Sequence, residues 1–176
     1  MSLILDTQLF HWLYGWLHRP PWLVVWSWLT HLGDFTVVGI PVFFGIVEGL
    51  VSRRRQERRP FLPWVGVLAA QGITFWLKGM VGRTRPFEIF QTINTLPSEL
   101  GHSFPSGHAT GAFAVARALS FRWPKGQVVW LSLAILVALS RVALGIHWPS
   151  DVVVGAGIGW SVVLGFGWIE KKFNGG

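Results

Sequence analysis

Residues 128–144 have the sequence VVWLSLAILVALSRVAL, in which Arg141 is the only charged residue. A stretch this apolar approaches the ~20 residues that a helix needs to cross the hydrocarbon core of a bilayer. Comparable stretches occur at residues 35–51, 61–81, 107–121 and 152–169. Together they predict five transmembrane helices, and residues 22–32, which end at Gly33-Asp34, would make a sixth. The expected fold class is therefore all-α, a polytopic membrane helical bundle with five to six transmembrane helices.

The composition agrees with a membrane protein and argues against other classes. Of the 176 residues, 51% are hydrophobic and 13% are charged, and this charged share is about half that of an ordinary soluble domain. These values exclude a disordered chain, a coiled coil and a typical cytosolic enzyme. The absence of cysteine excludes disulfides and thiolate metal sites. Because the spans and their loops use up the chain, residues 1–176 are expected to form one membrane-integral domain, with interfacial helices in 1–34 and the transmembrane core in 35–170.

The N-terminal stretch differs from the five spans. Residues 2–18 mix Leu, Phe and Trp with the polar side chains of Asp6, Gln8, His11 and His18. The stretch is too short and too polar to cross the bilayer, and it lacks the cationic start and the cleavage site of a signal peptide. Its aromatic residues are of the kind that concentrate at membrane–water interfaces. It predicts an N-terminal interfacial amphipathic helix, which Pro20-Pro21 ends.

Basic residues predict the orientation of the bundle. Residues 52–59 contain five Arg, and basic pairs follow at Arg122 with Lys125 and at Lys171 with Lys172. If the spans alternate, these segments share one face, which the positive-inside rule makes cytoplasmic. Residues 82–106 and 145–150 then lie on the outer face. The net charge of +7 would suggest nucleic acid in a soluble protein; here it indicates anionic lipid and an anionic substrate, so no nucleic-acid partner is expected.

Cations at the outer face run against the positive-inside rule and need another reason. They occur in KGMVGRTRP at residues 78–86 and SRVALGIHWPSD at residues 140–151, and PSGH lies between these at residues 105–108. Arg guanidinium groups match phosphoryl oxygens through paired hydrogen bonds, while Lys acts as a point charge. A helix that begins at Ser106-Gly107 adds free N–H groups and the positive end of its dipole. Together with Lys78, Arg85 and Arg141, this helix N-terminus predicts a phosphate site.

Two histidines and one carboxylate belong to the same segments. Two histidines around a phosphate suggest one nucleophile and one general acid. His147 and Asp151 are four residues apart, with Pro149 well placed at the start of a helix. A carboxylate at Asp151 can accept an N–H from His147, which fixes the tautomer and makes the other ring nitrogen the better nucleophile. His108 is then the candidate acid.

These three segments resemble the type 2 phosphatidic acid phosphatase superfamily of lipid phosphate phosphatases, in its bacterial membrane-integral branch. The family signatures K-x6-R-P, P-S-G-H and S-R-x5-H-x3-D match here in order, without a gap or substitution. The resemblance covers residues 35–169 approximately. It implies an enzyme that needs no metal or other cofactor, and the motifs themselves offer no cluster of carboxylates for Mg²⁺.

The resemblance also implies a role for each matched residue. His147 would attack phosphorus to form a phosphohistidine, Asp151 would orient His147, and His108 would protonate the leaving oxygen. Phosphate binding is assigned to five residues, namely Lys78, Arg85, Ser106, Gly107 and Arg141.

The substrate implied is a membrane lipid phosphate at the outer, periplasmic face of a bacterial inner membrane. Family members act on phosphatidic acid, phosphatidylglycerophosphate, undecaprenyl diphosphate and the 1-phosphate of lipid A. Many dedicated undecaprenyl-diphosphate enzymes carry Asp where Gly107 stands, which favours the phosphatidylglycerophosphate or lipid A branches. Two alternatives stay open, a lipid phosphotransferase on the same scaffold and a non-catalytic lipid transporter or structural protein. The sequence leaves the oligomeric state open.

Four other polar residues each have two interpretations. Arg83 falls at a variable position of the first signature and could support the site or contact lipid, and His102 could line the site or lie in a solvated loop. His31 and Asp34 are interpreted as a structural pair or a helix cap. The motif Gly155-x-x-x-Gly159 indicates close helix packing.

Overall fold

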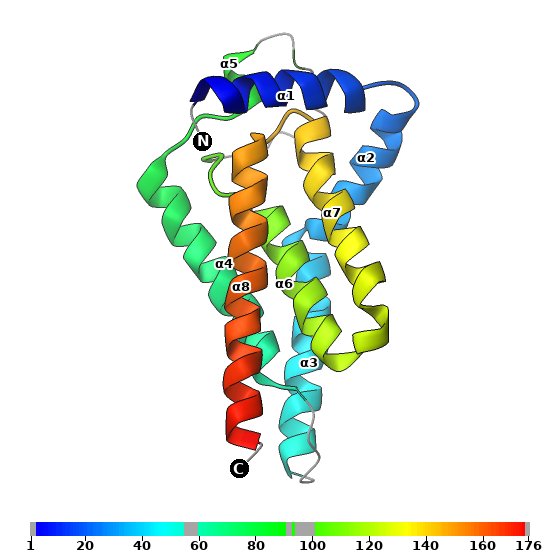
Figure 1. Ribbon diagram of the computed structural model, residues 1–176, viewed down its shortest axis with the longest axis vertical. Helices are drawn as coiled ribbons and strands as arrows, with labels where there is room; N and C mark the ends of the chain where they lie inside the picture. The colour runs from blue at the N-terminus through cyan, green and yellow to red at the C-terminus, as the bar shows by residue number, and fades with distance from the viewer. Residues whose placement is uncertain (1–2, 55–59, 91–92, 94–100, 175–176) are drawn as a thin grey trace.

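The computed structural model describes residues 3–54, 60–90, 93 and 101–174, which form helices joined by short connections (Figure 1). The helices in chain order are α1 (Leu3–Leu17), α2 (Trp22–Thr30), the 3₁₀ turn η1 (His31–Gly33), α3 (Phe35–Arg54), α4 (Leu62–Val81), α5 (Pro86–Ile89), α6 (Gly107–Arg122), the 3₁₀ turn η2 (Pro124–Gly126), α7 (Gln127–Ala143) and α8 (Pro149–Asn174). The prediction of an all-α bundle is confirmed.

Helix α6 lies at the centre of the bundle and packs against α3, α4, α7 and α8 (Figure 1). Its buried alanines, such as Ala114 and Ala118, meet Val67 of α4 and Val163 of α8 in one apolar cluster. On α8, a Cβ atom added at Gly159 would come within 2.2 Å of the Thr110 carbonyl oxygen. The glycine motif of α8 therefore serves close packing within the chain, as its spacing predicts.

Four helical runs in the described residues are long and apolar enough to cross a membrane, namely Trp22–Ser52, Leu62–Ile89, Pro124–Ala143 and Pro149–Phe173. The first run joins α2, η1 and α3. The possible sixth span predicted at residues 22–32 therefore continues into the span predicted at residues 35–51. Helix α6 is absent from this set because its 16 residues extend only ~24 Å and are rich in Ala and Gly. Since four helices surround α6, it needs neither the length nor the hydropathy of a lipid-facing helix.

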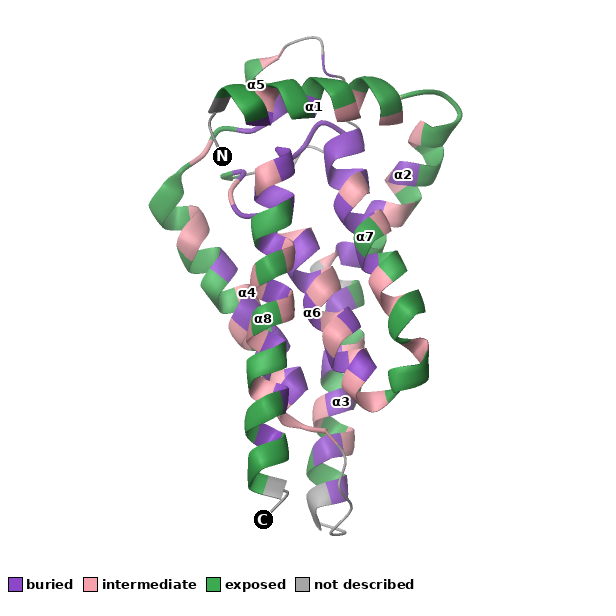
Figure 2. Cartoon of the chain, viewed as in Figure 1, coloured by how far each residue is buried: buried purple, intermediate pink, exposed green. Residues whose placement is uncertain are grey.

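The outer faces of the long helices are apolar and exposed, as Figure 2 shows along α4 and α8. Phe75 and Trp76 of α4 are 80% and 62% exposed, and Val153 of α8 is 69% exposed. Large apolar side chains spread over every outward helix face are typical of contact with lipid rather than water. The chain is a multi-pass membrane protein.

Basic residues gather at the end of the bundle away from α1. Arg122 forms an ion pair with Glu48 (3.0 Å), and Lys171 and Lys172 lie in the last turn of α8. At the same end the buried carboxylate of Glu170 accepts hydrogen bonds from the amides of Phe61 and Leu62, and so caps α4 (2.9–3.2 Å). Residues 55–59, which contribute to the predicted orientation, lie outside the described residues.

Helix α1 lies across the opposite end of the bundle, above the start of α8 (Figure 1). Its exposed side chains include Trp12 and Trp16, which are 65% and 68% exposed, and the polar Gln8 and His11. Its inward face buries Phe10 and Asp6, the latter only 2% exposed. The carboxylate of this helix is therefore turned into the protein, while its two tryptophans face the surroundings.

Candidate active site

Three backbone segments, residues 78–86, 101–108 and 141–151, meet under α1. Gly82 has a φ of 62° and ends α4 in the left-handed conformation that glycine favours, which turns the chain across the bundle. The amide of Ser103 donates to the carbonyl of Arg83 (2.7 Å), and the amide of Ser106 donates to the carbonyl of Asp151 (3.0 Å). These bonds bring all eight predicted site residues to one end of the bundle: Lys78, Arg85, Ser106, Gly107, His108, Arg141, His147 and Asp151.

His147 and Asp151 lie side by side in the corner between α7 and α8, and both are almost completely buried. The carboxylate Oδ2 of Asp151 lies 3.4 Å from His147 Nδ1 and accepts the amide of Trp148 (3.0 Å). The hydroxyl of Ser103 lies between the pair, 3.4 Å from Nδ1 and in a short hydrogen bond to the same carboxylate oxygen. Nδ1 therefore faces the carboxylate, and Nε2 points the other way, 3.4 Å from Arg85 Nη1.

Sequence reasoning missed Ser103. It lies outside the three signatures, and the only hint was its place two residues before Pro105 in the loop that enters α6.

The three predicted phosphate-binding cations are held by oxygens of the protein. Lys78 Nζ donates to the carbonyl of His102 (2.7 Å), and Arg85 donates to the carbonyls of Gly101 (2.8 Å) and Ile146 (3.3 Å). Arg141 is fully buried, and its guanidinium donates to the hydroxyl of Thr30. Lys78 is half-buried, whereas the charges of Arg85 and Arg141 are removed from water, which strengthens their interaction with any anion that enters.

The N-terminus of α6 adds uncharged donors beside Lys78. The hydroxyl of Ser106 caps α6 by accepting the amide of Ala109 (3.4 Å), and the half-buried Gly107 is its first residue. A cavity of about 320 Å³ lies between α4 and α6 at this point. It is lined by Gln71, Gly72, Thr74, Phe75, Lys78 and Gly107. A cavity with a cation on one wall and a helix N-terminus on the other suits a phosphate group.

His108, in the first turn of α6, has a partner that the signatures do not contain. Its Nε2 lies 2.9 Å from Asp34 Oδ1, and the other carboxylate oxygen of Asp34 lies 2.8 Å from His31 Nδ1. The predicted pairing of His31 with Asp34 is confirmed, and the contact between Asp34 and His108 is new. Spacing gave no sign of it, because Asp34 and His108 are 74 residues apart.

Arg83 contacts the site directly, which decides between the two roles that the sequence left open. Its guanidinium bonds the second carboxylate oxygen of Asp151 (2.6 Å) and the hydroxyl of Ser150 (2.7 Å), and it stacks over Trp148 at 5.0 Å. Its other end bonds the buried carboxylate of Asp6 in α1 (2.6 Å). Asp6 also accepts the amide of Ser150 (3.1 Å). The N-terminal helix is thus linked through Arg83 to the carboxylate that lies beside His147.

His102 contributes to the site through its backbone carbonyl, while its side chain is exposed. In the part of the chain that the structure describes, no three His, Cys, Asp or Glu side chains are grouped so as to hold a metal ion.

Known proteins are similar to this chain in both sequence and fold. The family model of the PAP2 superfamily matches residues 60–174. A Mycobacterium tuberculosis protein named decaprenylphosphoryl-5-phosphoribose phosphatase is 32% identical over 149 residues, which cover 82% of this chain and 78% of that protein. A Rhizobium etli lipid A 1-phosphatase is 34% identical over 157 residues, covering 77% of this chain and 66% of that protein.

Among solved structures, LpxE from Aquifex aeolicus superposes with a TM-score of 0.77 at 25% sequence identity. The superposition covers 96% of this chain and 95% of that one. The helical arrangement, including the helix across the end of the bundle, therefore lies within a fold that is already known.

The bond between Asp6 and Arg83 is expected to stabilise the whole end of the bundle. Asp6→Ala and Arg83→Ala should each lower the free energy of unfolding by roughly 3 kcal/mol, because the first removes one of the two carboxylates that Arg83 bonds and the second leaves the buried Asp6 and Asp151 without their shared cation. The double variant should cost about 1–3 kcal/mol less than the sum of the two. Unfolding in detergent micelles would measure this.

Arg19→Ala is the matched control, because the exposed Arg19 bonds only its neighbouring carbonyl of Gly15 among described contacts. It should change the free energy of unfolding by less than about 0.5 kcal/mol. Strict additivity of Asp6→Ala and Arg83→Ala would contradict the bond.

Proposed function

Because this chain belongs to the PAP2 superfamily and is a lipid phosphatase, we propose that it hydrolyses the terminal phosphate of an envelope lipid through a phosphohistidine intermediate. One observation carries the mechanism. His147 has one ring nitrogen towards the carboxylate of Asp151 and the other, Nε2, towards the guanidinium of Arg85. The carboxylate on one side can orient the imidazole ring, and the guanidinium on the other side can bind the oxygens of a phosphate. This arrangement suits attack by Nε2 on phosphorus.

The first chemical step transfers the phosphoryl group from the lipid to the protein. Nε2 of His147 forms a bond to phosphorus as the bond to the lipid oxygen breaks, and His108 gives its proton to that leaving oxygen. In the second step water attacks the phosphohistidine, His108 accepts the water proton, and inorganic phosphate leaves. Both histidines return to their starting states, so the cycle needs no further reactant.

Stabilisation of the transferring group is electrostatic. Lys78, Arg85 and Arg141 would neutralise its three equatorial oxygens, with Ser106 and the amide of Gly107 as additional donors. Removing a single such donor in other enzymes lowers turnover by about 10²–10³-fold. Because three cations and a helix N-terminus supply the countercharge, we propose that the reaction proceeds without a divalent ion.

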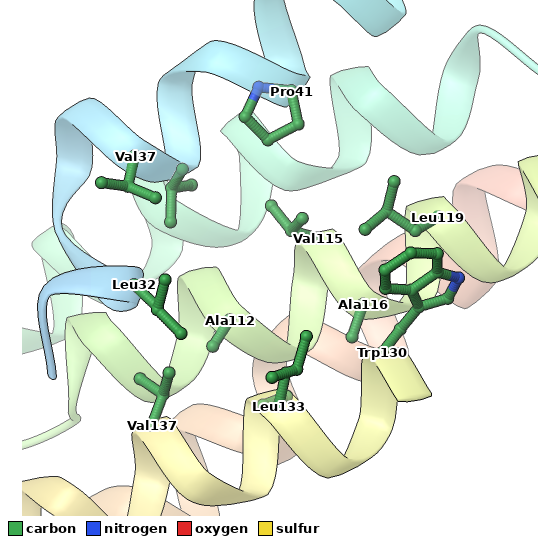
Figure 3. Close-up of a pocket in the computed structure, with 12 residues that line it drawn as sticks. Leu32, Val37, Pro41, Ala112, Val115, Ala116, Leu119, Trp130, Leu133 and Val137 are labelled. Carbon is green, nitrogen blue, oxygen red and sulfur yellow. The ribbon is translucent and has the colours of Figure 1, made fainter. Parts of the chain in front are cut away.

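The lipid tail has a candidate place beside the proposed acid. Figure 3 shows an apolar groove between α3, α6 and α7, with a volume of about 180 Å³ and walls that include Leu32, Ala112 and Val137. The end of the groove at Leu32 and Val137 adjoins His108, since a Cβ atom added at Gly33 would lie within 3 Å of both Val137 and His108. We propose that a hydrocarbon chain lies here while its phosphate reaches His147.

The substrate class proposed is a phosphorylated lipid of the bacterial envelope, with its tail in the bilayer. The names of the relatives, a lipid A 1-phosphatase and a decaprenylphosphoryl-5-phosphoribose phosphatase, support lipids of different size. Phosphatidylglycerophosphate, phosphatidic acid and undecaprenyl diphosphate complete the panel to test. We propose further that residues 1–176 act as one domain, because α1 bonds Arg83 and Ser150 at the site.

The site is proposed to face the periplasm. The described basic residues Arg122, Lys125, Lys171 and Lys172 lie at the end away from α1, and such residues prefer the cytoplasmic side. The lipid phosphate would then be hydrolysed in the outer leaflet of the inner membrane.

His147→Ala should abolish release of inorganic phosphate from every lipid of the panel, because the nucleophile is lost while the fold keeps its other contacts. Asp151→Asn should retain more activity, since attack continues with a less well-oriented imidazole. The assay is phosphate release by purified protein in EDTA, without an acceptor lipid. More than a few per cent of activity in His147→Ala would contradict the mechanism, and an absolute need for an acceptor lipid would favour a phosphotransferase.

Ala112→Phe should fill the groove and raise KM for a long-chain lipid phosphate by roughly tenfold, which corresponds to about 1.4 kcal/mol of binding. Turnover of a short, soluble phosphate ester should stay within about twofold because that ester has no tail to place. Val153→Phe is the matched control, since it adds the same ring to an exposed position on α8. An unchanged KM for the long-chain lipid would place the tail elsewhere.

Single cysteines test the orientation, because the chain has none of its own. Arg19→Cys, in the exposed turn after α1, should react with a membrane-impermeant maleimide in intact cells. Lys125→Cys, in the exposed turn before α7, should react only after the cells are opened. The reverse pattern would put the site on the cytoplasmic side.

A further inference from the structure

We propose that Asp34 is a positioning residue that holds His108 as an imidazolium, so that the site contains a second histidine–carboxylate pair dedicated to the proton donor. The inference rests on the proposed function, in which His108 protonates the leaving oxygen. It assigns Asp34, which lies outside the three signatures, a part in the chemistry.

The two residues are brought together by a tight crossing of the chain. Asp34 follows η1 and precedes α3, and His108 lies in the first turn of α6. A Cβ atom added at Gly33 would lie 2.9 Å from His108 Cδ2 and 2.8 Å from Val137 Cγ1. Glycine at position 33 lets the backbone of this turn pass close to the side chains of His108 and Val137. The close approach places the next residue, Asp34, with its Oδ1 2.9 Å from His108 Nε2.

A carboxylate at hydrogen-bond distance stabilises the charged form of an imidazole over the neutral form. The imidazolium donates Nε2–H to Asp34, which leaves Nδ1–H as the proton for the leaving oxygen. When the bond between phosphorus and the lipid oxygen breaks, that oxygen takes the Nδ1 proton, and His108 becomes neutral with its Nε2–H still on Asp34. In the second step Nδ1 takes the proton of the attacking water, which restores the imidazolium.

Helix capping is the simpler explanation for an aspartate at this position. The carbonyl of Asp34 accepts the amide of Val38 (2.9 Å) as α3 begins, and Asp is a favoured residue before a helix. Capping accounts for the residue type but not for a carboxylate oxygen aimed at a histidine on another helix. Asn caps a helix as well as Asp does, so Asp34→Asn removes the charge while keeping the cap.

Other charged groups close to the pair are few among the described residues. His31, which is 62% exposed at its side chain, bonds the second oxygen of Asp34. From α7, Arg141 approaches the same turn through its bond to Thr30, the residue before His31. Arg141 belongs to the proposed phosphate site, and its charge is not altered by changes at Asp34.

The test compares two leaving groups in wild type, Asp34→Asn, His108→Ala and the control His31→Gln. Phosphatidic acid releases a poor alkoxide leaving group that needs a proton, whereas p-nitrophenyl phosphate releases an anion that is stable by itself. Asp34→Asn should lower kcat for phosphatidic acid roughly 10- to 100-fold, a part of the 10²–10⁴-fold that general acid–base catalysis supplies. The same variant should lower kcat for p-nitrophenyl phosphate by less than about threefold. The control His31→Gln should change kcat for each of the two substrates by less than about twofold.

The pH profile gives a second readout that a structural role would not move. For phosphatidic acid, the alkaline fall of kcat reports loss of the His108 proton, so Asp34→Asn should shift that limb to lower pH and leave the acidic limb in place. In a His108→Ala background, Asp34→Asn should have no further effect on kcat.

Equal losses on both substrates, or an unmoved alkaline limb, would overturn the role of Asp34 while the proposed function stands. Absence of phosphate release by the wild type from all lipids would overturn both.

Discussion

The carboxylate of Asp151 is the group on which the arrangement of the site depends. It has no exposed surface, and a buried charge of this kind is tolerated only when donors surround it. The donors come from three separate parts of the chain: Arg83 after α4, the Ser103 hydroxyl before α6, and the Trp148 amide in its own corner. To satisfy this one anion, the chain must bring all three segments together. The same convergence gathers the cations and histidines of the proposed site.

The N-terminal helix extends that constraint to the surface of the bundle. Arg83 is shared between Asp151 and Asp6, so the carboxylate of α1 is linked through one guanidinium to the carboxylate that lies beside His147. Further along, His18 lies 2.9 Å from the carbonyl of Ala143, at the end of α7. The N-terminal segment is thereby attached to the bundle through Asp6 and His18. It lies across the three segments that meet beneath it.

The sequence predicted the helices and the segments of the site because both are recorded in local patterns. Apolar runs define the spans, and fixed spacings define Lys78 with Arg85, or His147 with Asp151. The contacts of Ser103 with Asp151, of Asp6 with Ser150 and of Asp34 with His108 were not predicted, because the partners are 48, 144 and 74 residues apart and a single polar residue forms no periodic pattern. The span predicted at residues 107–121 corresponds to α6 (Gly107–Arg122), but its position among four surrounding helices was not predicted. Hydropathy reports contact with lipid, and α6 is surrounded by protein.

The two histidines of the proposed mechanism lie at different depths. His147, the proposed nucleophile, is 1% exposed, and side-chain atoms of Asp151, Ser103 and Arg85 lie 3.4 Å from its ring nitrogens. The side chain of His108, the proposed acid, is 14% exposed, and that of its partner Asp34 is 38% exposed. In the proposed mechanism the first histidine keeps one orientation, while the second exchanges a proton with lipid and water. The difference in depth between the corner at α8 and the turn before α3 suits these two proposed roles.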